Sequence, residues 1–223
     1  MPIRVTPLIT GQYYHVFNRG VEKRQIFNDR RDYLRAIETY KFYKFHDLHL
    51  RLSEYHNLTL EAKTVFEENI LDKRDCMVDF ICYCLMPNHF HFVLRQTLDD
   101  GISQFLRRFS DSYTRYFNER NDRCGSLFQG PFKAVLVESD EQLLYVSRYV
   151  HLNPYTSFLI KDTDELIYYP WSSLNEYISE SVGICKKEIV LDNFSSKEEY
   201  REFVFDQADY QRSLENIEHL VFE

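Results

Sequence analysis

Two histidines separated by one residue, His89 and His91, are the residues of this sequence best suited to chemistry. They lie in the run MPNHFHFVL, which is rich in strand-forming side chains. Because side chains alternate along a strand, both imidazoles should point to one face while Phe90 and Phe92 point into a core. Two imidazoles on one face can hold a divalent cation and leave coordination positions open for a substrate oxygen or water. The pattern predicts half of a metal site; the alternative is a polar surface strand that carries two histidines by chance.

A second pair of chemically suited residues lies about sixty positions later, on an expected helix. Tyr149 and Asn153 are four residues apart and therefore neighbours on one helix face. An asparagine oxygen is a suitable third ligand for Mg²⁺ or Mn²⁺, and a phenol one turn away can reach a phosphate bound to that ion. The chain has 17 tyrosines, so on spacing alone Tyr113 and Tyr116 are alternatives for a nucleophile.

The order of the expected elements predicts the fold that must position these residues. Strands are expected over residues 13–18, 78–85, 89–95 and 133–138, and amphipathic helices over residues 29–46, 101–118 and 139–153. The order strand, helix, strand, strand, helix, strand is the ferredoxin-like split βαβ arrangement of an α+β protein. It predicts a four-stranded antiparallel sheet with two helices on one face and a further helix after the last strand. The other face is expected to stay open and to receive the two histidines.

Helix ends and connections can be read from particular residues. Ser139 with Gln142 forms a capping-box pattern that should begin the helix after the last strand. Pro154 predicts that this helix ends at about residues 152–153. Pro87-Asn88 predicts a hairpin between the second and third strands. A polar helical stretch within about residues 47–75 is expected to be an insertion packed at one edge.

Composition favours one main domain with an acidic end. The formal net charge of −8 argues at first sight against a nucleic-acid partner, but residues 188–223 alone hold ten acidic and three basic residues. Residues 12–35 and residues 101–133 each hold six basic and three acidic residues. Five cysteines, with no secretory signal and no long apolar stretch, predict a cytoplasmic protein with reduced thiols and no membrane segment.

Three motifs together resemble a known family. They are YHV followed by Arg19-Gly20 at residues 14–20, MPNHFH at residues 86–91 and YVHLNP at residues 149–154. In this combination the chain is similar to the single-tyrosine transposases of the HUH endonuclease group, the transposases of the smallest insertion sequences. The nearest likeness is to the branch called REP-associated tyrosine transposases. The resemblance covers about residues 10–178, and it implies a catalytic domain over residues 1–178 followed by an acidic helical region over residues 179–223.

The resemblance implies a role for each candidate residue. His89, His91 and Asn153 would bind Mg²⁺ or Mn²⁺, and Tyr149 would be the nucleophile. Many relatives from mobile elements have Gln at the position of Asn153, and this shorter side chain is one reason to prefer the REP-associated branch. In the implied reaction Tyr149 attacks a phosphate of single-stranded DNA, forms a 5′-phosphotyrosine link and frees a 3′-hydroxyl. His151 is a candidate helper, although its helix position points away from Tyr149.

The resemblance also implies a DNA partner and a strand-transferase activity. Family members bind single-stranded DNA next to a hairpin formed by a palindromic repeat. Basic residues in the two locally basic stretches are the candidate phosphate contacts. They are Arg19, Lys23 and Arg24 in the first stretch, and Arg107, Arg108, Arg115, Arg120, Arg123 and Lys133 in the second. The sequence leaves open whether the protein is a monomer or a homodimer.

Two other functions remain open from the sequence. A structural zinc site is one, because a two-residue turn at Pro87-Asn88 would pair Cys84 with His91 and bring Cys82 to the same face. A DNA-binding regulator that keeps the fold but does not cleave DNA is the other. The intact set of two histidines, tyrosine and asparagine favours catalysis.

Overall fold

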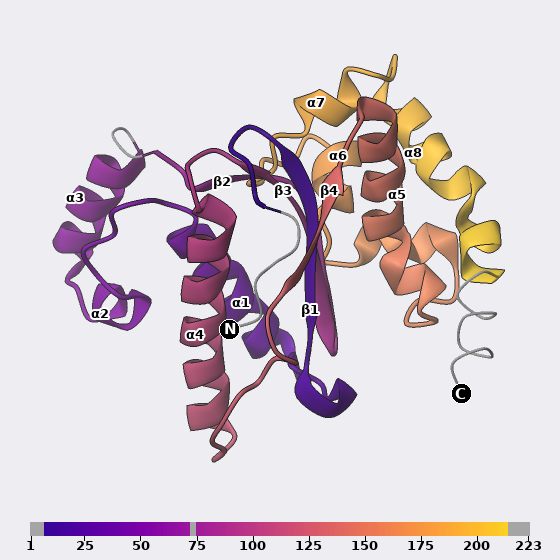
Figure 1. Ribbon diagram of the computed structural model, residues 1–223. Coiled ribbons are helices and arrows are strands. Elements are labelled where there is room, and N and C mark those ends of the chain that lie inside the picture. Colours follow the sequence, from indigo (N-terminus) through magenta and orange to yellow (C-terminus); the bar gives the residue numbers. More distant parts are fainter. Residues whose placement is uncertain (1–6, 72–74, 214–223) are drawn as a thin grey trace.

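The computed structural model describes residues 7–71 and 75–213, and its centre is a four-stranded antiparallel sheet with helices on both sides (Figure 1). The strands are β1 (Tyr13–Arg19), β2 (Val78–Met86), β3 (His89–Gln96) and β4 (Lys133–Val137), and they lie in the order β2-β3-β1-β4. Helix α1 (Arg30–Tyr43) joins β1 to β2, and helix α4 (Gly101–Arg120) joins β3 to β4. This confirms the predicted ferredoxin-like α+β fold. Parts of the predicted insertion (72–74) and of the predicted acidic end (214–223) lie outside the described residues.

The first core lies between the sheet and helices α1 and α4. Alternation along β3 turns Phe90 and Phe92 toward these helices, where Phe92 meets Phe105 and Phe109 of α4 at ring-centroid distances of 6.3 and 5.8 Å. Complete burial of such a ring stabilises a fold by roughly 1.5–3 kcal/mol. Since this core fixes one face of β3, the histidines that alternate with the phenylalanines must occupy the other face.

A second core covers part of the sheet face that was expected to be open. Helix α5 (Asp140–Thr156) packs on β2, and β2 is therefore buried along its whole length. An irregularity between Phe80 and Cys82 leaves Ile81 without a partner on β3, and both Ile81 and Cys82 join the second core. The prediction of an open face was wrong over β2 and β3. It holds near the β4 edge, where Val135 is 51% exposed.

Helix α5 begins where its sequence predicts and ends later than its sequence predicts. Ser139 is the N-cap, with its side chain accepting a hydrogen bond from the Gln142 backbone N–H at 3.1 Å. Gln142 Oε1 in turn accepts from the Glu138 backbone N–H at 2.7 Å. The helix continues through Pro154 to Thr156, because Pro154, Tyr155 and Thr156 are all buried. Tertiary packing therefore outweighs the hydrogen bond that proline cannot donate.

The remaining elements flank this framework. Two short helices of the predicted insertion, α2 (Leu52–His56) and α3 (Leu60–Leu71), lie beside α1 and α4, on the side of the molecule away from α5 (Figure 1). The chain after α5 forms α6 (Leu174–Ile178), α7 (Glu188–Leu191) and α8 (Lys197–Asp206). The second core combines side chains from both sides of residue 178, while the predicted boundary there stays a prediction. Within the described ranges no helix is both long and apolar enough to cross a membrane.

Candidate functional site

The two histidines of β3 lie side by side on the face opposite the first core. Their ring centroids are 4.9 Å apart, and the rings are nearly perpendicular, at 86°. His91 is 5% exposed and His89 is half-buried. The alternation that predicted a shared face for both imidazoles is therefore present in the structure.

Helix α5 brings the tyrosine and the asparagine to these histidines. Asn153 Oδ1 lies 3.3 Å from His89 Nε2. One turn earlier, the ring of Tyr149 stands edge-on to His91, with centroids 5.6 Å apart. The four residues that the sequence selected from two distant motifs thus occupy one site.

A fifth residue, His15 of β1, completes the site and was not among the residues selected from the sequence. His15 Nε2 and His91 Nδ1 are 2.9 Å apart, and the ring of His15 lies 5.7 Å from that of Tyr149. A signal for it was present in the sequence. Tyr14 and Val16 are core residues, so alternation sends His15 to the opposite face of the sheet, the face of His91.

The imidazoles of the site are held in their neutral form. Burial lowers the pKa of His15 from its ordinary value of 6.5 to about 4. Burial, with a smaller effect from the charge of Arg19, lowers the pKa of His89 to about 4. Burial and the neighbouring histidines hold the pKa of His91 well below its ordinary value. Neutral imidazoles keep the lone pair that a metal ligand requires.

The surroundings of His89 fit a cation. Asn88 Oδ1 lies 2.6 Å from its Nδ1 and Asn153 Oδ1 lies 3.3 Å from its Nε2, so an acceptor oxygen faces each ring nitrogen. A neutral imidazole has one N–H. If Nδ1–H donates to Asn88, the Nε2 lone pair faces the Asn153 oxygen. Two adjacent ligands of an octahedral ion are separated by about 3 Å, which agrees with this spacing.

The hairpin turn that precedes His89 is fixed by the turn that follows β1. Pro87 O accepts from the backbone N–H groups of Ile26 at 2.8 Å and Phe27 at 3.0 Å, and Asn88 O accepts from Gly20 N–H at 2.8 Å. A Cβ on Gly20 would lie 2.4 Å from the Arg24 carbonyl oxygen. Only glycine permits this close approach, which explains the Arg19-Gly20 pair in the sequence.

Part of the predicted basic set surrounds the site. Arg19 ends β1 directly opposite His89 in the strand register, and Lys133 begins β4 opposite Phe17 on the same sheet face. Lys23 and Arg24 belong to the turn that contacts Asn88, where Asn88 Nδ2 donates to Lys23 O at 3.3 Å. Arg19 and Lys133 therefore adjoin the uncovered part of the face, whereas Arg24 pairs with Glu22 within the turn at 3.2 Å.

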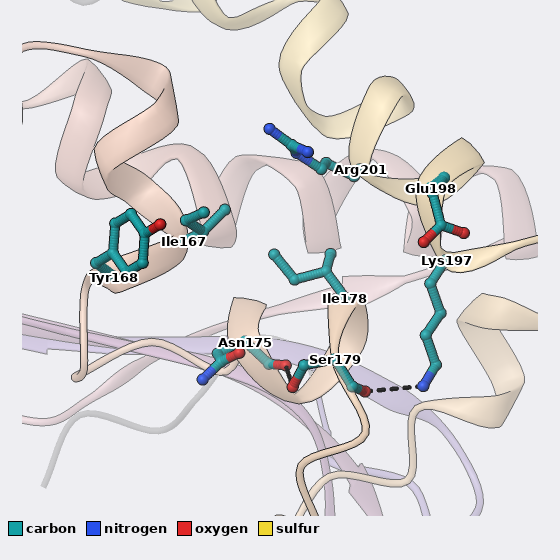
Figure 2. A pocket seen from close by; sticks show the side chains of 8 residues that line it. All are labelled: Ile167, Tyr168, Asn175, Ile178, Ser179, Lys197, Glu198 and Arg201. Atoms are coloured by element: carbon teal, nitrogen blue, oxygen red, sulfur yellow. Dashed lines mark hydrogen bonds between the residues drawn. The ribbon is translucent and has the colours of Figure 1, made fainter.

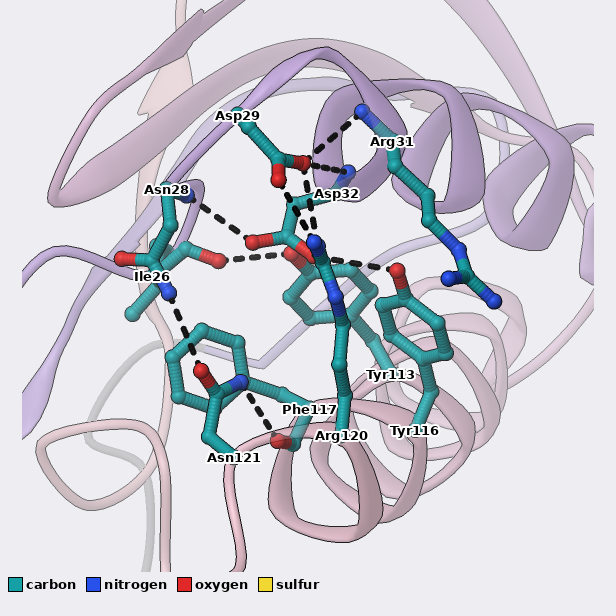
Figure 3. Close-up of polar contacts among 10 residues, drawn as sticks. All are labelled: Ile26, Asn28, Asp29, Arg31, Asp32, Tyr113, Tyr116, Phe117, Arg120 and Asn121. Carbon is teal, nitrogen blue, oxygen red and sulfur yellow. Dashed lines mark hydrogen bonds and ion pairs between the residues drawn. The ribbon is translucent and has the colours of Figure 1, made fainter.

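The predicted basic residues of α4 and of the loop after it lie apart from the histidines, because α4 packs against the opposite face of the sheet. Three of them are bonded within the protein. Arg108 donates to Phe45 O at 3.4 Å, and Arg123 donates to Ser126 O at 3.0 Å. Arg120 is paired with Asp29 and with the buried Asp32, which ties the end of α4 to the start of α1 (Figure 3). This leaves Arg107 and Arg115, which line a groove of about 1130 Å³ between α4 and the 126–132 loop.

The alternative nucleophiles and the candidate helper do not face the histidines. Tyr113 donates to the Ile26 carbonyl at 2.6 Å in the first core, and Tyr116 donates to Asp32 at 3.0 Å. His151 lies in the second core, bonded on both ring nitrogens to residues other than Tyr149. The helper hypothesis for His151 was wrong, because two positions along a helix turn a side chain to the other side.

The strand register that a structural zinc site requires is present, but its cluster of ligands is not found among the described residues. Cys84 pairs with His91, as the two-residue turn predicted. However, across residues 7–71 and 75–213 no three His, Cys, Asp or Glu side chains are placed to hold a metal ion. Burial raises the pKa of both Cys82 and Cys84 well above the ordinary value, which disfavours the thiolate that zinc binds.

Comparison with known proteins identifies the family. Among solved structures, the chain is similar to a REP-associated tyrosine transposase bound to a REP hairpin, with 14% identity, a TM-score of 0.49, and coverage of 88% of this chain and 96% of that chain. No curated protein matches. The family model described as "Transposase IS200 like" matches residues 9–153, a span that holds every residue of the site. Because this match covers well over half of the sequence, the protein belongs to the family of IS200-like transposases, as its three motifs implied.

Proposed function

We propose that this transposase cleaves and rejoins single-stranded DNA through a covalent bond to Tyr149. The observation that carries the proposal is the meeting of two elements in one chain: Tyr149 and Asn153 of α5 face His91 and His89 of β3. One chain supplies all of these residues, which supports cleavage within a single subunit.

The site fits Mg²⁺ or Mn²⁺ held by His89, His91 and Asn153. When bound, such an ion would draw negative charge from the phosphate under attack. The Tyr149 hydroxyl loses its proton as its oxygen forms the new bond to phosphorus, and the bond from phosphorus to the 3′ oxygen breaks. That oxygen takes up a proton and leaves as a 3′-hydroxyl, while Tyr149 keeps the 5′-phosphate. Attack by another 3′-hydroxyl reverses the step and rejoins DNA without an external energy source.

His15 would set the hydrogen-bonding state of His91. If His91 Nδ1–H donates to His15 Nε2 across their 2.9 Å separation, His91 Nε2 keeps its lone pair for the ion. Asn88 Oδ1 would accept from His89 Nδ1–H in the same way. Each proposed ligand histidine would then have an acceptor at Nδ1 and bind metal through Nε2. We therefore assign His15 and Asn88 as positioning residues.

The substrate we propose is single-stranded DNA beside a hairpin, as in the REP-associated branch. Arg19 and Lys133 would contact phosphates of the strand that enters the site, because they lie on the sheet face of the histidines. Lys23 and Arg24 would add contacts from the turn that holds Asn88. Arg107 and Arg115 form a separate basic surface along α4 and would contact DNA that continues past the β4 edge.

A covalent trapping experiment tests this function. Labelled hairpin DNA with a single-stranded flank, incubated with the protein and Mn²⁺, should yield a protein–DNA adduct that resists denaturation. Tyr149→Phe should abolish the adduct, whereas Tyr145→Phe, one turn earlier on α5 and 47% exposed, should retain it. An adduct that persists in Tyr149→Phe would remove Tyr149 from the mechanism. DNA binding by the wild type without any adduct would instead support the non-cleaving regulator.

A further inference from the structure

Helix α5 carries the tyrosine and the asparagine of the site, and the chain that follows residue 153 packs against this helix and supports it. Its inner side packs on β2, while α8 contacts its outer side (Figure 1). The support comes from residues beyond the family match, which ends at Asn153. Its contacts with α5 are specific hydrogen bonds and ring contacts rather than apolar packing alone.

The central contact is made by His151, which lies midway between Tyr149 and Asn153 in sequence and is fully buried. Its Nδ1 lies 2.8 Å from the hydroxyl of Tyr200 on α8, and its Nε2 lies 2.9 Å from Ser173 Oγ. Ser147 Oγ, one turn earlier on α5, is 3.2 Å from the same Tyr200 hydroxyl. A single phenol oxygen of α8 thus bonds two successive turns of α5.

The chain of contacts continues from α5 to the sheet. Ser173 Oγ accepts from the Tyr83 backbone N–H of β2 at 2.8 Å. The segment around Ser173 also covers the outer edge of β2, where Leu85 N–H donates to Trp171 O at 2.8 Å. His151 therefore connects α8 to the edge strand of the sheet that presents the two ligand histidines.

Two further contacts hold α5 on either side of His151. The Arg148 guanidinium lies 4.4 Å from the ring centroid of Phe203 and donates to its carbonyl at 3.3 Å. Tyr155 donates to Asp209 at 2.5 Å. Anchors at positions 148, 151 and 155 restrict both rotation of the helix and sliding along its axis.

Helix α8 is itself fixed to the segments that follow α5. Lys197 Nζ donates to Ser179 O at 2.8 Å beside a small cavity of about 330 Å³ lined by α6 and α8 (Figure 2). Arg201 pairs with Asp164 at 3.3 Å. The segments that pack against α5 are therefore bonded to one another as well as to α5.

The rotation of α5 matters because each residue advances about 100° around a helix axis. A small rotation would move Asn153 Oδ1 away from His89 Nε2 and Tyr149 away from His91. We propose that Tyr200 is a positioning residue which, through His151, holds α5 in the rotation that the site needs. The predicted change in the rate of adduct formation rests on the proposed function. The predicted change in amide hydrogen exchange of α5 does not.

Two tyrosine-to-phenylalanine variants provide a matched test. Tyr200→Phe keeps the buried ring and removes the hydroxyl that bonds α5. Tyr177→Phe removes a hydroxyl from an equally buried ring, 4.8 Å from the same histidine, but that hydroxyl bonds Ile81 O of β2 at 2.7 Å. The two substitutions should lower the melting temperature to a similar extent, so a general loss of stability would affect both alike.

The expected result is a difference in rate between the two variants. At saturating DNA and well below the melting temperature, adduct formation should slow by about tenfold or more in Tyr200→Phe and by less than about twofold in Tyr177→Phe. The affinity for DNA should be unchanged in both. Equal rates in the two variants would overturn the positioning role. Should Tyr200→Phe fail to fold, Ser147→Ala removes one of the two bonds to that hydroxyl and should slow adduct formation by a smaller factor.

Amide hydrogen exchange separates this inference from the proposed function. Exchange over residues 145–156 should be faster in Tyr200→Phe than in Tyr177→Phe, with exchange over β3 unchanged. This comparison needs neither DNA nor metal, so it remains decisive if the wild type forms no adduct. Equal protection of α5 in the two variants would contradict the inference, whatever the fate of the proposed chemistry.

Discussion

At the scale of the residue, His89 and His91 each have a polar neighbour at Nδ1, and in the proposed function this neighbour fixes which ring nitrogen carries the proton. Asn88 lies against Nδ1 of His89, and His15 lies against Nδ1 of His91. Partners of this kind orient metal-binding histidines and raise their basicity. His15 is therefore as much a part of the site as the two histidines of the sequence motif, which we propose to be the metal ligands.

Replacement of His15 tests this arrangement. His15→Phe removes the acceptor for His91, and we expect the affinity for Mn²⁺ and the rate of adduct formation to fall by roughly 10- to 100-fold. His15→Gln retains an acceptor oxygen and should recover part of the loss. Isothermal titration with Mn²⁺ and the trapping assay measure the two effects. Tyr13→Phe, on the same face of β1, is the control. Unchanged Mn²⁺ affinity in His15→Phe would show that His15 does not position His91.

At the scale of the element, α4 carries basic residues with two different uses. Arg120 joins α4 to α1 through Asp29 and Asp32, and Asp32 also accepts from Tyr116 (Figure 3). Arg107 lines the groove on another side of the same helix. In the sequence these arginines belong to one basic stretch. In the fold, Arg120 holds α4 against α1, whereas Arg107 lies at the surface of the groove.

Substitutions of the two arginines should therefore separate stability from DNA binding. Arg120→Gln leaves the buried Asp32 carboxylate without its cation and should lower the melting temperature by several degrees, with little effect on DNA affinity. Arg107→Gln should leave the melting temperature unchanged and weaken DNA binding severalfold at low salt. Thermal unfolding and fluorescence anisotropy measure both properties. Equal loss of DNA affinity in the two variants would contradict this division.

The helices and strands also show which structural features local sequence patterns can predict. Period-two alternation in residues 89–95 and the i, i+4 spacing of Tyr149 and Asn153 predicted the faces correctly, because each face is set by local geometry. The extension of α5 past Pro154, the cover over β2 and the partners of Arg120 depend on segments distant in sequence. Alternation along β1 could have placed His15 on the face of the histidines, but only the pairing of β1 with β3 brings it to His91. Local patterns do not identify such partners.

At the scale of the whole molecule, the buried histidines make the fold sensitive to acid. Burial lowers the pKa of His151 from 6.5 to about 3. Between these values the unfolded chain binds a proton that the folded chain does not, so folding is fully favoured above pH 6.5 and loses stability as the pH falls toward 3. The lowered pKa values of His15, His89 and His91 act in the same direction.

The free energy of unfolding should therefore decrease between pH 7 and pH 5. His151 alone accounts for about 2 kcal/mol at pH 5, as an order of magnitude. Urea unfolding in the presence of a chelator, followed by circular dichroism, measures the change without metal binding. His151→Gln should show a shallower dependence on pH than the wild type. A wild-type stability that stays constant down to pH 5 would show that these histidines are not neutral in the folded protein.

The separation of Tyr149 from Tyr200 along the chain has a consequence for synthesis. The ribosome completes β1, β3 and α5 before it reaches α8, and roughly fifty further residues take several seconds at ordinary elongation rates. During that interval the nascent polypeptide already contains the residues that we propose to be catalytic but lacks the contacts between α8 and their helix. If Tyr200 positions α5 as we propose, such an unfinished chain should break DNA more slowly than the completed protein does.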